Sequence, residues 1–227
     1  MTRPCIVRDL GLMSYAEAVA IQESIADQRK IGEGADHLLF VEHPHVITIG
    51  RNGRESNVLA SPELLRARGI EVHESNRGGD VTYHGPGQIV AYPIVDLREW
   101  KRDVGAFVRA IEDTIIATLE AFGIHAFRVA RLTGVWTGSD PVPAKIAAIG
   151  VHLSRWVSTH GFALNVTTDL SCFDFIVPCG LRKPVTSIER MGVMADPEDV
   201  KRALARHFGR IFDFEMSGAE MLTGAMR

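Results

Sequence analysis

Residues 145–180 read KIAAIGVHLSRWVSTHGFALNVTTDLSCFDFIVPCG, and the rest of the chain is organised around this stretch. It begins with an apolar run that predicts a strand, which we expect to pair with Val157–Val166 as a hairpin. It ends with Cys179, held between Pro178 and Gly180. Proline fixes its own φ and glycine adds backbone freedom, so the sequence predicts a turn that presents the thiol to a cleft.

Lys145 and Cys179 each allow two interpretations. An ammonium group at the mouth of an apolar strand either extends to water or takes part in chemistry. A lone cysteine is more often a small buried hydrophobic residue than a nucleophile. Taken alone, the two residues therefore favour a structural interpretation, with an exposed lysine and a buried cysteine. The remainder of the chain has to decide between the two interpretations.

The composition is that of a globular chain with one core. The chain has 227 residues, of which 46% are hydrophobic and 23% are charged, and this predicts a single domain over residues 1–227. The net charge is −3 and the isoelectric point is near 6.3. These values argue against a general nucleic-acid binder, so we expect no nucleic-acid partner.

The cysteines and the N-terminus predict a compartment. The three cysteines have no regular spacing and no CxxC motif, so they do not form a disulfide framework. They fit a reducing cytoplasm, in which Cys5 and Cys172 are interpreted as inert. The N-terminus has no apolar signal region, and no window approaches the ~18 uninterrupted apolar residues of a membrane span. We therefore expect a cytoplasmic protein without a membrane partner.

Helix and strand patterns alternate along the chain without an internal repeat. Helices are expected from Ser14 to about Lys30, from Ser61-Pro62 to Gly69, from Asp103 to Gly123 and from Asp196-Pro197 to at least Ile211. Strands are expected at 37–42, 46–49, 70–74, 81–83, 89–95, 124–129, 134–137, 145–153 and 157–166. No element is expected before Ser14, and the tail after Phe214 is weakly specified. This order predicts an α+β fold with a mixed, mostly antiparallel sheet backed by helices.

A glycine-rich loop, RGGDVTYHGPGQ, occupies residues 77–88. It matches neither the Walker A nor the GxGxxG pattern. Its glycines would let the backbone approach a ligand closely, although a tight hairpin would use them in the same way. Arg77 beside the glycine pair and His84 beside Gly85 favour a ligand, because a buried turn rarely needs both side chains.

The nine histidines do not predict a metal site. His43-Pro44-His45 has no helical partner four residues away, and no Cys/His pairs occur at zinc spacing, so we expect no metal and no cofactor. His160 is interpreted as a core histidine with satisfied hydrogen bonds. A serine hydrolase lacks support because no GxSxG motif is present.

Three pieces of sequence in this order resemble one enzyme family. They are RGGxVTYHGPGQ at 77–88, KIAAIGV at 145–151 leading to HGFALN at 160–165, and PCG at 178–180. Together they closely resemble the octanoyl-[acyl carrier protein]:protein octanoyltransferases of lipoate biosynthesis, over roughly Leu38–Gly192. Asp80 falls where the polar residue of the family varies. The resemblance implies a fold similar to the catalytic domain of biotin and lipoate protein ligases.

The resemblance also implies an activity and a set of site residues. The family moves an octanoyl group from octanoyl-acyl carrier protein, through a cysteine thioester, to a lysine of a lipoyl domain. The acceptors implied are the lipoyl domains of 2-oxoacid dehydrogenase complexes or the glycine cleavage H protein, and no metal or nucleotide is implied. The matching catalytic positions are Cys179 and Lys145. The matching substrate-binding positions are Arg77, Gly78, Gly79, Asp80, Val81, Thr82, Tyr83, His84, Ala148, Ile149, Gly150, Gly161, Phe162 and Ala163.

The overall negative charge of this chain cannot attract an acidic acyl carrier protein. A local basic patch must do so. The candidates from the sequence are Arg128, Arg131, Arg155, Arg182 and Lys183.

Other functions remain open at this point. An ATP-dependent lipoate or biotin protein ligase would share the fold, the glycine loop and the lysine, but it needs no nucleophilic cysteine, so Cys179 favours the transferase. A non-catalytic module that binds acyl carrier protein gives no reason for Lys145 and Cys179 to meet. A thioesterase differs only in passing the acyl group to water.

Overall fold

The computed structural model describes residues 2–138, 142–177 and 183–218. The helices in these ranges are α1 (Tyr15–Lys30), α2 (Pro62–Ala67), α3 (Val104–Ala121) and α4 (Pro197–Phe212), with short 3₁₀ helices at Glu55–Asn57, Leu170–Phe175 and Glu189–Met191. The strands are β1 (Arg3–Leu12), β2 (Asp36–Glu42), β3 (Val46–Ile49), β4 (Glu71–Glu74), β5 (Val81–His84), β6 (Gln88–Ile94), β7 (Ala126–Val129), β8 (Leu132–Thr137), β9 (Ala144–Ser154), β10 (Val157–Asn165) and β11 (Phe214–Ser217).

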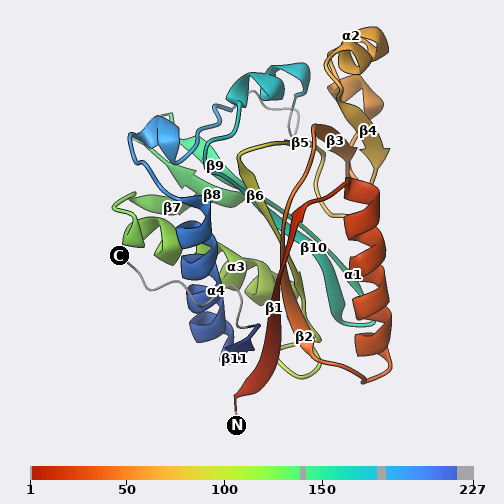
Figure 1. The fold of residues 1–227 in the computed structure, drawn as a ribbon, viewed down its shortest axis with the longest axis vertical. Helices are drawn as coiled ribbons and strands as arrows, with labels where there is room; N and C mark the ends of the chain where they lie inside the picture. The colour runs from red at the N-terminus through yellow and green to blue at the C-terminus, as the bar shows by residue number, and fades with distance from the viewer. Residues whose placement is uncertain (1, 139–141, 178–182, 219–227) are drawn as a thin grey trace.

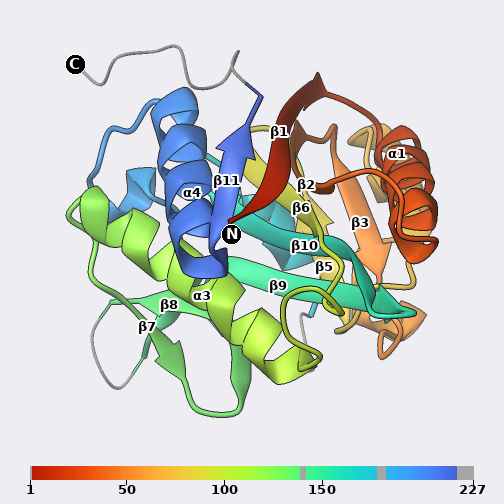
Figure 2. The ribbon, with the colours of Figure 1, turned by 90° about the horizontal axis from the view of Figure 1, so that it is seen from below.

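The fold is built on one large sheet with helices on both faces. Helix α1 covers one face of this sheet, and α3 and α4 cover the other (Figures 1 and 2). The larger hydrophobic core lies on the side of α3 and α4, and a smaller one lies under α1. The α+β architecture expected from the sequence, a mixed sheet backed by helices, is confirmed.

Within the described residues the large sheet has the strand order β11-β1-β2-β6-β10-β9-β8-β7. Strands β1, β2 and β11 pair in parallel, whereas every pair from β2 to β7 is antiparallel. The expected hairpin of β9 and β10 is confirmed, with Ser154 opposite Val157. The two residues between them, Arg155 and Trp156, have φ values of 52° and 70°, as a type I′ turn requires.

The small sheet has the order β4-β3-β5 and lies beside the start of α1 (Figure 1). A third hydrophobic cluster joins β3 and β5 to the 3₁₀ helix at Leu170–Phe175. Tyr15, the first residue of α1, donates a hydrogen bond to Ser75 at 2.7 Å and contacts the ring of His73. These contacts hold the small sheet against α1, which itself packs on the large sheet. Residues of both sheets line the site described below.

The α-helices begin at the capping residues that the sequence predicted. Ser14 and Glu17 form the expected capping box. The side chains of Ser61, Asp103 and Asp196 each accept a hydrogen bond from a backbone N–H of the following turn. No helix among the described residues has the length and apolar character needed to cross a membrane.

Two strands lie where the sequence predicted no element. β1 pairs with β11 in a parallel register, with Arg3 opposite Phe214. Only Cys5 and Val7 of β1 are buried, so its sequence carries little hydrophobic alternation. The two strands are stabilised by pairing between the two ends of the chain, and local sequence patterns cannot report that pairing.

Candidate active site

A cavity of about 480 Å³ is lined by residues of both sheets. The site residues expected from the sequence that line it are Lys145, Arg77, Gly78, Gly79, Asp80, Val81, Thr82, His84, Ala148, Ile149, Gly150, Gly161, Phe162 and Ala163. Cys179 lies outside the described residues. The fold therefore gathers the glycine loop, Lys145 and the β9–β10 hairpin around one space, and their role in binding stays a prediction.

Tyr83 is the one described site residue that does not line the cavity. Successive residues of a strand face opposite sides, so Tyr83 points away from the side taken by Thr82 and His84. Its ring packs in the third hydrophobic cluster, 5.4 Å from the ring of Phe173, and its hydroxyl is 2.7 Å from Nδ1 of His45. The side chain of Tyr83 therefore packs behind the strand and does not line the cavity.

The floor of the cavity is a trough of small residues on the hairpin. Ala148 lies opposite Ala163, and Gly150 lies opposite Gly161, in the β9–β10 ladder. A Cβ on Gly150 would come within 2.7 Å of the carbonyl oxygen of Gly78, because the glycine loop packs directly on β9. A Cβ on Gly161 would overlap the carbonyl of Ala91 on β6. These glycines are therefore required by close packing of the backbone, independently of any ligand.

A β-bulge turns Lys145 toward the cavity. Val135 of β8 pairs with Ala147 of β9, and both lie in the core under α3 and α4. The next residue of β8, Trp136, faces the other side and pairs with Lys145. Moving one residue along β8 therefore corresponds to moving two residues along β9, from Ala147 to Lys145. In a regular ladder Lys145 would share the buried face of Ala147. The extra residue moves it to the face of Trp136, which lines the cavity.

The surroundings of Lys145 hold the bulge in place. Gly134 has φ of 122°, and a Cβ there would come within 2.7 Å of the Ala147 oxygen and 3.4 Å of Cε of Lys145. The buried carboxylate of Glu112 accepts the N–H of Gly134 at 3.1 Å and is itself bound by Arg128 at 2.7 Å. Nζ of Lys145 lies 4.8 Å from the centre of the Trp136 ring, within range of a cation–π interaction.

The backbone of Lys145 also anchors a segment that follows Cys179 in sequence. The N–H of Lys145 donates to the carbonyl of Pro184 at 2.8 Å, and its own carbonyl accepts the N–H of Thr186 at 2.9 Å. Lys183 and Val185, from the same segment, line the cavity. Nζ of Lys183 is 5.7 Å from the centre of the Trp136 ring that Lys145 also approaches.

His160 departs from the satisfied core histidine that the sequence suggested. It is buried, and its Nε2 bonds Oδ1 of Asn76 at 2.5 Å, but it also lines the cavity and has a φ of 57°. Its Nδ1 has no hydrogen-bond partner among the described residues. Burial, together with a smaller contribution from the nearby Arg77 guanidinium, lowers the pKa of His160 to about 4. The ring is therefore neutral at physiological pH.

Several cavity residues carried no signal in the sequence. They are Tyr15 at the start of α1, Tyr92 on β6, Val108 on α3 and Trp136 on β8. Tyr92 lies in a strand that is buried at every position, so alternation could not single it out. Its hydroxyl lies 2.7 Å from Nε2 of His43, whose Nδ1 faces the carbonyl of Met13 at 2.8 Å. A carbonyl only accepts, so Nδ1 carries the proton and the tyrosine donates to Nε2.

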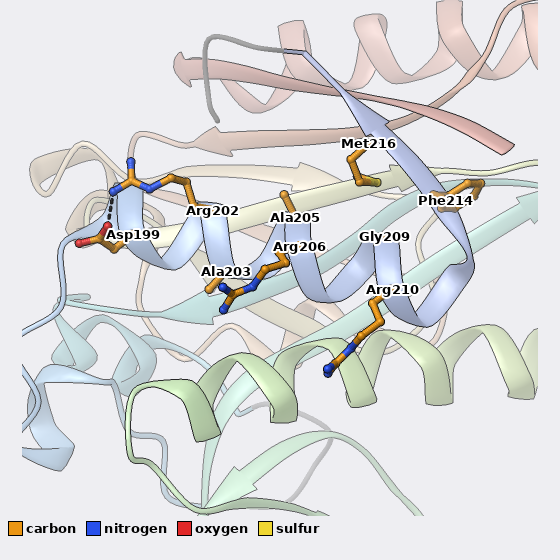
Figure 3. A pocket seen from close by; sticks show the side chains of 9 residues that line it. All are labelled: Asp199, Arg202, Ala203, Ala205, Arg206, Gly209, Arg210, Phe214 and Met216. Atoms are coloured by element: carbon orange, nitrogen blue, oxygen red, sulfur yellow. Dashed lines mark hydrogen bonds and ion pairs between the residues drawn. The ribbon is translucent and has the colours of Figure 1, made fainter. Parts of the chain in front are cut away.

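A second hollow lies between α4 and β11 (Figure 3). Its volume is about 390 Å³, and arginines line it beside Phe214 and Met216. It contains none of the site residues expected from the sequence. Among the described residues no group of His, Cys, Asp or Glu side chains is arranged to hold a metal ion.

The chain is similar in sequence to a known protein family and to known enzymes. The family model described as "Lipoyl protein ligase A/B catalytic domain" matches residues 14–209. An octanoyltransferase of Solibacter usitatus is 60% identical over 98% of this chain and 100% of its own length. One of Acidobacterium capsulatum is 49% identical, covering 91% of this chain and 89% of the relative.

A solved structure confirms the expected fold. A bipartite lipoate protein ligase from Thermoplasma acidophilum superposes with a TM-score of 0.74 over 96% of this chain and 86% of that one, at 19% identity. The similarity to the fold of lipoate ligases, expected from the sequence, is therefore confirmed.

The bulge at Lys145 predicts the effect of one small substitution. Gly134→Ala has to displace the Ala147 carbonyl and the lysine stem, so we expect octanoyl transfer, the activity of the relatives, to fall about ten-fold or more, which is at least ~1.4 kcal/mol. Gly138→Ala is the matched control, because Gly138 also has a positive φ of 97° but has nothing within 4 Å of a Cβ. Equal losses in the two purified variants would show that the space beside Lys145 is not needed.

Proposed function

Because the chain belongs to the lipoyl protein ligase A/B catalytic-domain family, among its octanoyltransferases, we propose that it transfers octanoyl groups through a thioester on Cys179. As a member of that group it is an acyltransferase. The proposed donor is octanoyl-acyl carrier protein, and the proposed acceptor is a lysine of a lipoyl domain, in the first step of endogenous protein lipoylation. The proposed compartment is the cytoplasm, where a reducing environment keeps the thiol free.

The observation that carries this proposal is that Lys145 and the apolar residues of β9 and β10 line the same cavity. The cavity of about 480 Å³ has room for an alkyl chain beside apolar residues of β9 and β10 such as Ile149 and Phe162. Lys145 lines the same cavity from the start of β9. Burying about six methylene groups contributes roughly 5 kcal/mol, enough to hold the chain. One extra methylene changes binding by only ~1–3 kcal/mol, so neighbouring chain lengths are expected to react more weakly and not to be excluded.

The first half-reaction exchanges one thioester for another. The Cys179 thiolate attacks the carbonyl carbon of the donor, the new C–S bond forms, and the thiolate of the carrier leaves. Lys145 accepts the proton from Cys179 and returns it to the departing thiolate, so the protons balance. Exchange between thioesters costs little free energy, which is why a thiolate suits this donor.

The second half-reaction makes greater demands on Lys145. Suppose that Lys145 only lowered the pKa of a thiol by about two units. The thiolate fraction would rise roughly twenty-fold, but each thiolate would react about six- to ten-fold more slowly, because nucleophilicity falls with pKa. The net gain is about two- to four-fold. Accepting the proton of the attacking lysine amine, and giving it to the leaving Cys179 thiolate, is worth roughly 10²–10⁴-fold. Proton transfer is therefore the larger role.

An ATP-dependent lipoate protein ligase is the second candidate, because the fold is shared with a solved lipoate ligase. Such a ligase activates its acid with nucleotide and has no use for Cys179. The relatives of highest identity reported above are octanoyltransferases, which favours the thioester route. A non-catalytic carrier-binding module is set aside, because those relatives are enzymes.

Of the basic residues expected to bind the carrier, only some lie at the cavity. Arg131 and Lys183 line the cavity. Arg128 forms ion pairs with Glu112 and Asp113, each at 2.7 Å, and Arg155 lies in the turn at the far end of β9. Arg182 lies outside the described residues. Arg131 and Lys183 are therefore the proposed contacts for an acidic donor.

The proposed thioester predicts a single modified cysteine. After incubation with octanoyl-acyl carrier protein, peptide mapping by mass spectrometry should find octanoyl on Cys179 alone. Cys179→Ser should abolish transfer to a lipoyl domain. Cys172→Ser is the control and should leave transfer nearly intact, because Cys172 is buried in the third hydrophobic cluster. An acyl group mapped to Cys172 would contradict the assignment.

The proposed proton transfer predicts unequal effects of Lys145→Arg. A guanidinium keeps the positive charge but stays protonated at any working pH, so it cannot carry the proton. We expect the variant to form some acyl-enzyme and to pass the group to the acceptor roughly 10²–10⁴-fold more slowly. Single-turnover kinetics measures the two half-reactions separately. Equal losses in both, or near-normal release, would show that Lys145 acts through charge or structure instead.

The proposed donor contacts predict a difference in salt dependence. Transfer from octanoyl-acyl carrier protein should weaken with added salt more steeply than transfer from a small octanoyl thioester, because salt screens the carrier's charges. Arg131→Gln and Lys183→Gln should reduce that difference, whereas Arg155→Gln should not. The same salt dependence for both donors would remove the electrostatic argument.

A further inference from the structure

A chain of hydrogen bonds fixes which nitrogen of His84 carries the proton. Asn165 donates Nδ2–H to the carbonyl of Thr186 at 2.9 Å, which leaves its Oδ1 to accept from Gln88 Nε2 at 2.8 Å. Gln88 Nε2 also faces the carbonyl of Tyr83 at 3.3 Å. Because carbonyls only accept, both amide orientations are determined, and Oε1 of Gln88 faces Nδ1 of His84 at 2.7 Å. His84 therefore carries its proton on Nδ1.

The other ring nitrogen of His84, Nε2, is left as a bare acceptor at the cavity. His84 lines the cavity, and no described residue forms a hydrogen bond with its Nε2. The ring of His43 is 6.0 Å away but has no proton to offer, since its Nδ1 proton goes to Met13 and its Nε2 accepts from Tyr92. Nε2 of His84 can thus accept one hydrogen bond from a ligand.

The ring of His84 stays neutral over the working pH range. Burial is the main reason that its pKa is lowered to about 3, and the nearby Arg77 guanidinium acts in the same direction. Gln88, the hydrogen-bond partner of its Nδ1, is an uncharged amide. A neutral imidazole with a fixed tautomer presents the same acceptor throughout the neutral pH range.

His84 and Lys145 line the same cavity, and a chain of hydrogen bonds links them. In the large sheet Gln88 pairs with Asn165, and the residue before Asn165 pairs with Ala147 of β9. Asn165 bonds the carbonyl of Thr186, whose N–H bonds the carbonyl of Lys145. Hydrogen bonds thus connect the side chain of His84 to the backbone of Lys145 through the side chains of Gln88 and Asn165 and the backbone of Thr186.

The chemistry of the reaction limits what a bare nitrogen can bind. The thioester carbonyl and the oxyanion that forms from it are acceptors, so Nε2 of His84 cannot stabilise either of them. The acceptor lysine, in contrast, arrives as a neutral amine with two N–H groups and one lone pair. An acceptor for each N–H would direct the lone pair at the thioester carbon.

We infer that Nε2 of His84 accepts one N–H of the incoming lysine amine and is a further catalytic residue of the second half-reaction. This inference rests on the proposed function. As the C–N bond forms and the C–S bond to Cys179 breaks, one amine proton passes to Lys145 and from there to the leaving sulfur. The other N–H stays on the product amide, bound to His84. No proton rests on His84 itself.

Two substitutions separate the two nitrogens of His84. In His84→Gln the amide oxygen reaches the position of Nε2 and the bond to Gln88 is lost. In His84→Asn the side chain can keep the bond to Gln88, but nothing replaces Nε2. We expect release to a lipoyl-domain lysine to fall about ten-fold in His84→Asn, as for the loss of one hydrogen bond, and within about three-fold in His84→Gln. Formation of the acyl-enzyme should change less than about three-fold in both.

The opposite order would overturn the inference. If His84→Asn transfers the octanoyl group to the lipoyl domain faster than His84→Gln does, then activity depends on the hydrogen bond to Gln88, and the role of His84 is structural. If acylation falls as much as release, His84 serves the donor instead. Thermal unfolding of both variants shows whether they fold. If they do not, ¹⁵N NMR of the wild-type imidazole decides, because a proton on Nε2 would exclude the acceptor role. If the wild-type protein forms no acyl-enzyme, the proposed function itself fails.

Discussion

One extra residue in β9 determines which face of the sheet Lys145 occupies. A regular ladder would place Lys145 beside Ala147, in the core under α3 and α4. Burying an ammonium in an apolar core is costly, so the regular register would lower stability and would also keep the lysine out of the cavity. The bulge resolves both problems, since it turns Lys145 over the Trp136 ring and into the cavity. Gly134 leaves room for the turn, and Glu112 fixes the N–H of that glycine.

The fold was predictable where its signals are local. The helix at Tyr15–Lys30 follows from a capping box, and the β9–β10 hairpin follows from two apolar runs separated by a short turn. β1 and β11 could not be predicted, because each is stabilised by pairing with the opposite end of the chain. Cys5 and Val7 alone are too few buried positions to reveal a strand.

Much of the cavity lining was predictable, because a long sequence pattern marks it. That pattern named the residues around the cavity, but it could not separate the two faces of β5, so it included Tyr83, which packs on the far side. It also missed Tyr92 and Trp136, whose positions depend on the register of the sheet. The bulge itself is invisible in the sequence, because it requires knowing which residue of β8 pairs with Lys145.

The central claim is that the octanoyl group rests on this protein between donor and acceptor, without nucleotide. Intact-protein mass spectrometry tests it most directly. With octanoyl-acyl carrier protein and no ATP, the protein should gain the mass of one octanoyl group. On addition of a lipoyl domain, that mass should move to the domain. No gain without ATP would contradict the account and favour a ligase, and loss of the group while the lipoyl domain stays unmodified would indicate a thioesterase.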